Sequence, residues 1–212
     1  MGIVSGAITG ARFRVVGELP QGWREVFRDR LNDHAFRAPP QGQGKEQVEG
    51  WVQVHNILDA SFDVHDRWLV DNVVWFALRV DVKRLPQKLF RATLEKRIEA
   101  WCAQRKVDKA PAPVREELKD ELEREWLART LPNVTVTEAA WSIDRKWLLL
   151  HSHSEAVAER FRKRFFRTFG FKLVPWSPLD WLGDPKLVNG LLARAPAPAF
   201  HRDEVRLTRE LR

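Results

Sequence analysis

The sequence predicts an α+β fold in which antiparallel strands pack with long amphipathic helices, arranged as two strand–helix lobes. Short segments that alternate apolar and polar residues, or are continuously apolar, indicate strands. Longer segments with apolar residues three to four positions apart indicate helices. Strands are expected at residues 11–16, 51–57, 73–82, 134–143, 146–151 and 171–176, and helices at 22–36, after Pro86, from Pro113 and at 154–169.

The domain organisation expected from this order is one main α+β region followed by a short extension. The main region covers residues 1–176, with its two lobes at about 1–109 and 110–176. The extension, residues 177–212, holds an Ala/Pro spacer and a charged tail.

The first strands and helix are predicted from local patterns. Residues 11–16 (ARFRVV) alternate Arg with Phe and Val, as in a half-buried strand. Residues 22–36 space their apolar side chains for a helix, and the Pro/Gly/Gln-rich residues 37–47 indicate a loop. The segment 73–82 (VVWFALRVDV) begins continuously apolar and then alternates, which is typical of a central strand whose end becomes exposed.

The central part of the chain predicts a helical hairpin. The helix after Pro86 aligns Phe90, Leu94, Ile98, Trp101 and Cys102 in one apolar stripe, so Cys102 is expected to fill a core. A second helix starts at Pro113, and six acidic residues fall between positions 116 and 125. The short joint between the two helices places them side by side.

The last strand pair turns at residues 144–146 and leads into a basic helix. Ser154 is the expected N-cap and Gly170 the residue that ends the helix in a left-handed conformation. Phe161 and Phe165 lie on the apolar stripe of this helix.

Composition favours a basic, cytoplasmic protein with a nucleic-acid or other polyanionic partner, and it disfavours several other classes. The 212 residues carry a formal net charge of +7, which favours a polyanionic partner. The single cysteine excludes an intrachain disulfide and a cysteine-based zinc site, and no segment has the length and apolarity of a membrane span. No nucleotide-binding glycine motif is present. His151 and His153 offer too few further ligands for a metal site, so no catalytic residue, metal or other cofactor is expected of a DNA-binding protein.

Two groups of cations are the candidate DNA-binding residues. On the basic helix, four cations recur at i, i+3, i+4 and i+7 on the side predicted to face away from Phe161 and Phe165. A stripe of this kind can follow a phosphate backbone and release counterions on binding. The first group is Arg160, Lys163, Arg164 and Arg167, and the second is Lys83, Arg84, Lys88, Arg91 and Arg97.

The order and spacing of these elements resemble the RdgC family of bacterial recombination-associated DNA-binding proteins. The resemblance covers roughly residues 50–176. It is carried by KRLP (83–86), the helix with Arg97 and Glu99, REELKDELE (115–123), Leu-Pro at 131–132, WSID (141–144) and SEAVAERFRK (154–163).

This resemblance implies sequence-nonspecific DNA binding, with duplex favoured over single strands, by a nucleoid-associated homodimer. Family members form a closed ring with a positive inner surface around duplex DNA and restrain RecA-driven recombination by competing for DNA. Where they carry consecutive arginines, this chain reads NVTVTEAAW (133–141), and the chain ends soon after its last strand. We therefore interpret it as a shortened, diverged member in which the basic helix takes over phosphate binding.

Two other functions remain open from the sequence. In the first, the acidic helix segment 116–125 and the segment WSPLDW (176–181) bind a protein partner, and the basic charge only aids solubility. In the second, a metal-dependent nuclease uses the loosely clustered aspartates Asp59, Asp63, Asp66 and Asp71 as metal ligands.

Overall fold

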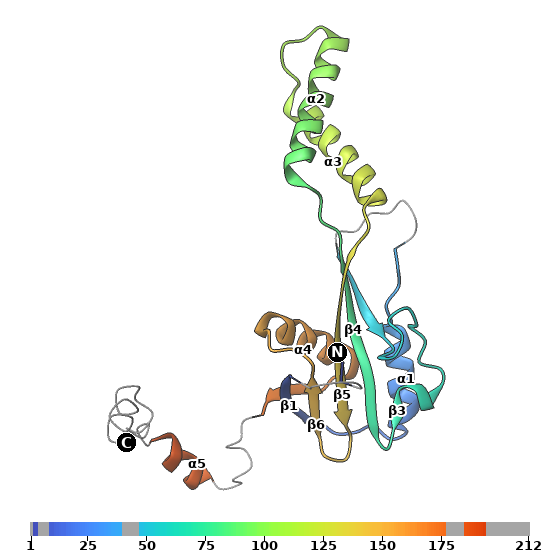
Figure 1. The fold of residues 1–212 in the computed structure, drawn as a ribbon, viewed down its shortest axis with the longest axis vertical. Helices are drawn as coiled ribbons and strands as arrows, with labels where there is room; N and C mark the ends of the chain where they lie inside the picture. The colour runs from blue at the N-terminus through green and yellow to red at the C-terminus, as the bar shows by residue number, and fades with distance from the viewer. Residues whose placement is uncertain (1, 4–8, 40–46, 177–184, 194–212) are drawn as a thin grey trace, which may run out of the picture. The chain divides into compact units, whose positions relative to one another are not determined.

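The computed structural model describes residues 2–3, 9–39, 47–176 and 185–193. Its elements are β1 (Ala11–Val16), α1 (Trp23–Asp33), β2 (Gln47–Val52), a 3₁₀ turn η1 (His65–Arg67), β3 (Leu69–Val70), β4 (Val73–Val82), α2 (Gln87–Arg105), α3 (Ala112–Arg129), β5 (Asn133–Ser142), β6 (Trp147–Leu150), α4 (Glu155–Phe169), β7 (Lys172–Pro175) and α5 (Pro185–Leu192) (Figure 1). Residues 1–174 form one compact unit, and residues 175–212 are a separate one.

A single seven-stranded sheet organises the first unit. The strand order is β2-β4-β5-β6-β1-β7, with β3 pairing on β4. The β4–β5 pair is in antiparallel register along its whole length, from Val73 opposite Ser142 to Val82 opposite Asn133. The pairs β2–β4, β3–β4, β5–β6 and β1–β6 are antiparallel too, which confirms the predicted α+β class.

The hydrophobic core lies on one face of this sheet, beneath α1 and α4. Alternate residues of the strands point to it, so Trp141 and Phe76 meet Phe161, Phe165 and Phe169 from α4. Aromatic rings pack there at centroid distances between 4.9 and 6.4 Å, in stacked, tilted and edge-to-face arrangements. These contacts fix α4 on the sheet and thereby determine which of its side chains face outward.

Trp51 anchors β2 in this core. Its ring is fully buried at 5.0 Å from Phe76 and 5.4 Å from Phe161, centroid to centroid. The indole N–H donates to the Thr168 hydroxyl at 2.8 Å, so burial leaves no polar atom of this side chain unpaired. Two buried residues of α4, Phe161 and Thr168, therefore hold Trp51 in place.

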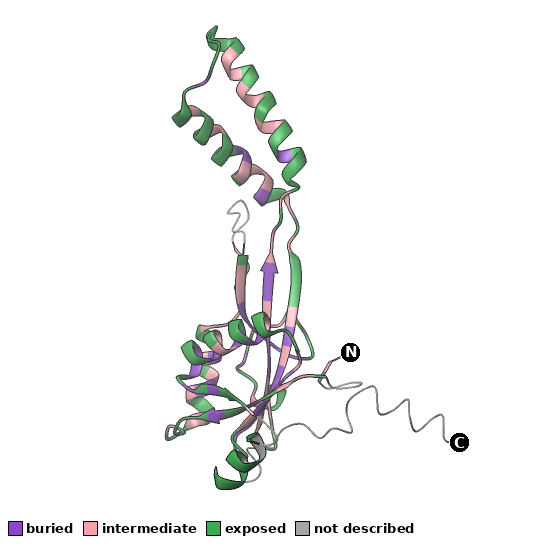
Figure 2. Cartoon of the chain, turned by 90° about the vertical axis from the view of Figure 1, so that its left-hand side faces the viewer, coloured by how far each residue is buried: buried purple, intermediate pink, exposed green. Residues whose placement is uncertain are grey.

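The helices α2 and α3 form the predicted hairpin, which extends beyond the end of β4 and β5 (Figure 1). Phe90 and Trp126 meet edge to face at 5.6 Å, and Leu122 is fully buried. Figure 2 shows that most of the hairpin is exposed or only partly buried. Cys102 is accordingly half-buried in the hairpin and not in the main core, because two helices alone cover only the seam between them.

Residue 109, expected near the boundary between two lobes, lies at the tip of the helical hairpin. Residues 106–111 form the tip of the hairpin, and the strands on either side of the hairpin, β4 and β5, pair with each other. Pairing between segments far apart in the chain leaves no local pattern in the sequence. The compact unit that contains the sheet ends at Val174.

Three further expectations differ from the structure. The strand predicted at 51–57 runs from Gln47 to Val52, because the chain then turns and the Gln53 N–H donates to the Asp59 carbonyl. Ser154 is the N-cap of α4 but its side chain makes no capping hydrogen bond. The expected spacer and tail in 177–212 lie outside the described residues, apart from 185–193.

Candidate nucleic-acid interface

The helix α4 presents three exposed cations to solvent. Its Phe161, Phe165 and Phe169 side chains are buried, which fixes the rotation of the helix against the sheet. Gly170 ends the helix with φ 78°, a conformation that costs glycine little, and donates to the Phe166 carbonyl at 2.8 Å. The exposed cations on the opposite side are Arg160, Lys163 and Arg167, and we call them the α4 stripe.

Within the α4 stripe, only Lys163 has an ion-pair partner among the described residues. Its ammonium lies 2.7 Å from Glu159 one turn earlier, and both side chains are more than half exposed. The hydrogen bond from Lys163 lowers the pKa of Glu159 below its ordinary value. An exposed pair of this kind contributes little to stability, so the lysine can exchange this carboxylate for a phosphate.

Arg164 does not belong to the exposed group, and the prediction that it faces away from the packed side is wrong. Its side chain is only 16% exposed, and its guanidinium donates to the His34 carbonyl at 3.0 Å and lies 3.8 Å from the Glu49 carboxylate. Burial lowers the pKa of Arg164, while Glu49 opposes that change. Arg164 therefore ties α4 to the end of α1 and to β2.

The second predicted group divides into internal and exposed cations. Lys83 donates to the Leu127 carbonyl at 2.5 Å, which fastens the end of β4 to the end of α3. Arg97 pairs with Glu125 across the hairpin. The exposed members are Arg84, Lys88 and Arg91, which lie where the sheet meets the hairpin, and we call them the joint cluster.

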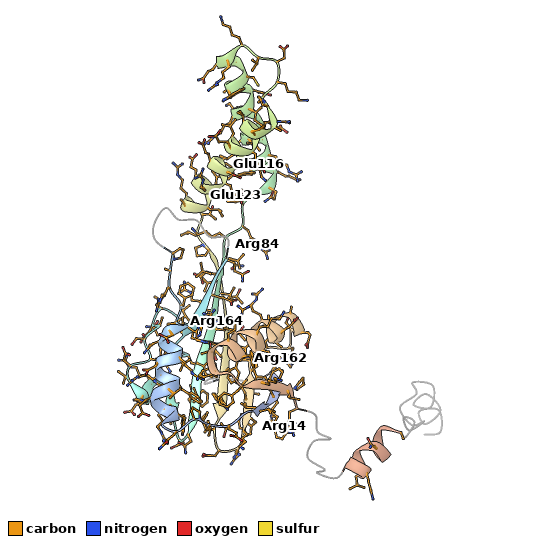
Figure 3. The ribbon with its side chains drawn as sticks, turned by 180° about the vertical axis from the view of Figure 1, so that it is seen from behind. Arg14, Arg84, Glu116, Glu123, Arg162 and Arg164 are labelled. Carbon is orange, nitrogen blue, oxygen red and sulfur yellow. The ribbon has the colours of Figure 1, made fainter. Side chains whose placement is uncertain are left out.

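A cavity of about 550 Å³ opens beside the joint cluster. Lys83, Arg84 and Lys119 line it together with Phe90 and Glu123. Figure 3 places Arg84 at the joint, and Arg162 and Arg164 on α4 against the sheet. The two predicted groups of cations therefore lie on different parts of the unit, one on the sheet layer and one at the base of the hairpin.

The aspartates considered for a nuclease are used locally. Asp59 pairs with Arg67 at 3.2 Å and accepts a hydrogen bond from the Ser61 N–H. Asp63 accepts from the Asn32 amide at 2.9 Å and from the Ser61 hydroxyl at 3.0 Å. Over the described ranges, no three His, Cys, Asp or Glu side chains gather closely enough to hold a metal ion.

The cations of β1 are not among the predicted binding residues. The alternation in ARFRVV correctly points Arg12 and Arg14 away from the core, but it does not show what lies beside them. In the structure, Arg12 and Arg14 are opposite Leu149 and Trp147 of β6. Cross-strand neighbours of this kind depend on the pairing register, which the sequence leaves open.

The comparisons with known proteins place the chain in a family. Among curated proteins, none matches this chain. In the parts of the chain described here, no helix combines the length and apolarity needed to cross a membrane. The model of a family described as "Putative exonuclease, RdgC" matches residues 13–186, and at the family level it supports a recombination-associated role in DNA binding. Because this match covers most of the chain, the protein belongs to the RdgC family.

Proposed function

We propose that this protein binds DNA without sequence preference and thereby modulates recombination or replication. The observation that carries the proposal is the α4 stripe, in which Arg160, Lys163 and Arg167 are all exposed on one helix face. Membership of the RdgC family supports the same role. Because the cations lie on a helix fixed by buried aromatic residues, their positions are set before DNA arrives.

The length of the α4 stripe suits a phosphate backbone. At about 1.5 Å of rise per residue, the span from Arg160 to Arg167 is about 10 Å along the helix. Duplex DNA carries about one negative charge per 1.7 Å of its axis, so about six phosphates fall within that span. None of the three cations needs a base edge for this contact, which is why the proposed binding is independent of sequence.

The joint cluster is the proposed second contact. Arg84, Lys88 and Arg91 are exposed, and Lys119 adds a positive charge at the neighbouring cavity. Lys83 and Arg97, the remaining predicted contacts in this group, keep their internal partners and support the geometry of the hairpin. In this proposal they position the exposed cations and do not bind phosphate themselves.

We further propose that the protein acts as a nucleoid-associated, cytoplasmic homodimer that favours duplex over single-stranded DNA at the α4 stripe. A dimer doubles the number of phosphates contacted and so steepens the dependence of affinity on salt. By occupying duplex DNA, it would restrain RecA-driven strand exchange. Inhibition of strand exchange that parallels DNA occupancy is the expected result, and inhibition without DNA binding would contradict this part of the proposal.

The proposed role is non-catalytic. The family description names an exonuclease, so the test is direct. End-labelled duplex DNA incubated with the protein and Mg²⁺ is expected to remain intact under conditions in which it is bound. Degradation that is lost on changing Asp59 and Asp63 to Asn would favour the nuclease function in its place.

The main experiment measures the affinity for two short duplexes of unrelated sequence across a series of salt concentrations. Equal affinities and a steep linear fall of log K with log salt are expected. A clear preference for one sequence would contradict the proposal. Weak, non-saturating binding at physiological salt would instead favour a protein-interaction module built on the exposed acidic residues of α3, of which Figure 3 labels Glu116.

A further inference from the structure

The sheet has a second face, and no helix of the first unit covers it in the part that the structure describes. Buried Phe13, Leu148 and Leu173 point to the core under α1 and α4, so their neighbours along each strand point the other way. The register aligns these neighbours in rows: Arg14 is opposite Trp147, and Trp147 is opposite Ser142. A parallel row runs from Arg12 through Leu149 and Ala140 to Trp75.

The part of this face formed by β6, β1 and β7 combines cations with apolar side chains. Arg12, Arg14 and Lys172 are exposed, and Val16 and Val174 are 45% and 38% exposed beside them. Trp147 is half-buried, with the Arg12 guanidinium carbon 5.8 Å from its ring centroid. The sequences of these three strands contain no carboxylate, so the open face, as we call this part, is uniformly positive. Figure 3 shows Arg14 on β1.

The rest of this side of the sheet is occupied. Toward β4 and β2, Trp75 and Ala77 pack with Val52 and Phe36 in a small second cluster. Near the middle of β5, the Ile3 N–H donates to the Glu138 carboxylate. On this part the Arg79 guanidinium lies over the Phe36 ring and pairs with Asp81, so its charge is already compensated by a carboxylate.

We propose that the open face binds single-stranded nucleic acid. A flat ring beside cations suits an unpaired base that stacks on Trp147 while its neighbouring phosphates contact Arg14 and Lys172. A base in a duplex is stacked between its neighbours and cannot reach the ring without being extruded, so the geometry selects single strands. The three strands carry no carboxylate that would repel a phosphate, so this surface is favourable for a polyanion.

This inference goes beyond the proposed function because it uses another surface. The α4 stripe lies on a helix that packs against the core face, and the open face is the opposite side of the same sheet. Duplex binding at the α4 stripe and single-strand binding at the open face therefore make separate predictions, and either can fail alone.

The experiment measures binding of a fluorescent oligo(dT) and of a duplex to four variants of the full chain. Trp147→Leu keeps an apolar side chain but removes the ring, and should weaken oligo(dT) binding by about fivefold or more, the effect of losing one base–aromatic stack. Trp147→Phe keeps a ring and should retain most of the affinity. Arg14→Glu with Lys172→Glu should abolish oligo(dT) binding, and the matched exposed pair on α3, Arg115→Glu with Arg124→Glu, should not.

Further measurements keep the outcome clear. Far-ultraviolet circular dichroism and thermal unfolding establish that each variant is folded, and Trp147→Phe tests the site even if Trp147→Leu is destabilised. Irradiation of bound 5-iodouracil oligonucleotide should cross-link Trp147, as identified by mass spectrometry. An oligo(U) probe in parallel distinguishes DNA from RNA as the preferred strand.

Several results would overturn the inference. Unchanged oligo(dT) affinity in folded Trp147→Leu would exclude stacking on this ring. Equal losses for duplex and oligo(dT) would mean that the face supplies only general positive charge. A shift in oligomeric state with unchanged oligonucleotide binding would assign the face to contacts between copies of the chain.

Discussion

Replacing Arg160 and Arg167 together by Ala tests whether the α4 stripe contacts phosphates. Both side chains are exposed, and no ion-pair partner is found for either among the described residues, so their removal leaves no buried group unpaired. The aromatic face of α4 is untouched, so the fold should persist. The expected effect is therefore confined to DNA binding.

The magnitude follows from counterion release. Each phosphate that a cation neutralises contributes about 0.9 to the slope of log K against log salt. Losing two contacts should reduce the slope by about 1.8. If the two proteins bind equally at 1 M salt, this difference in slope makes the variant bind about 60-fold more weakly than the unchanged protein at 0.1 M salt.

Fluorescence anisotropy with a short duplex, titrated at several salt concentrations, gives the slope directly. The matched control is Arg115→Ala with Arg124→Ala, which removes the same charge from exposed positions on the acidic helix α3. An unchanged slope in the α4 variant would refute the reasoning. Equal reductions in both variants would show that net charge, and not the stripe, governs binding.

Three further predictions concern stability. Phe161→Ala empties a fully buried site and should lower the free energy of unfolding by about 3–5 kcal/mol in urea titrations, whereas changing an exposed side chain should have little effect. Arg164→Met leaves Glu49 without its partner and should cost about 1–3 kcal/mol while the salt slope of DNA binding stays unchanged; a reduced slope would restore Arg164 as a phosphate contact. The hydrogen bond from Arg97 lowers the pKa of Glu125 from its ordinary value of 4.5, so the stabilisation that this pair gives is present above pH 4.5 and is lost as the pH falls through the lowered value. Helicity measured from pH 6 to pH 3 should therefore decrease, and the Glu125→Gln variant should not show this dependence on pH.

The elements with a strong local signal were predicted well from the sequence. The segment 73–82 forms β4 with the bounds expected, and the apolar periods of α2, α3 and α4 gave helices in the right places. These patterns reflect which side of an element is buried, and burial is what periodicity records. The β2 strand was displaced because Val54 is buried just beyond the end of the strand and so extends the apolar pattern into the following turn.

The candidate site was predicted less completely, for a geometric reason. Arg164 lies at the edge of the buried face of α4. Its side chain turns inward because the His34 carbonyl and the Glu49 carboxylate lie within its reach. The same limit explains why Trp147 was not linked to Arg14. Helical or strand period assigns a side chain to a face, but its neighbours on that face come from the tertiary fold.

The β4–β5 register has a consequence for how this fold is assembled. Val82 and Asn133 face each other at the end of the ladder, so residues 83–132 leave and re-enter the sheet at one place. The helices between them contact mainly each other, which makes them a self-contained insertion at the tip of a long β-hairpin. During folding, early formation of the helical hairpin would bring its two ends together and spare the strands the entropy of closing a long loop. In evolution, the same arrangement lets the insertion change in length or charge while the two strands that flank it keep their pairing.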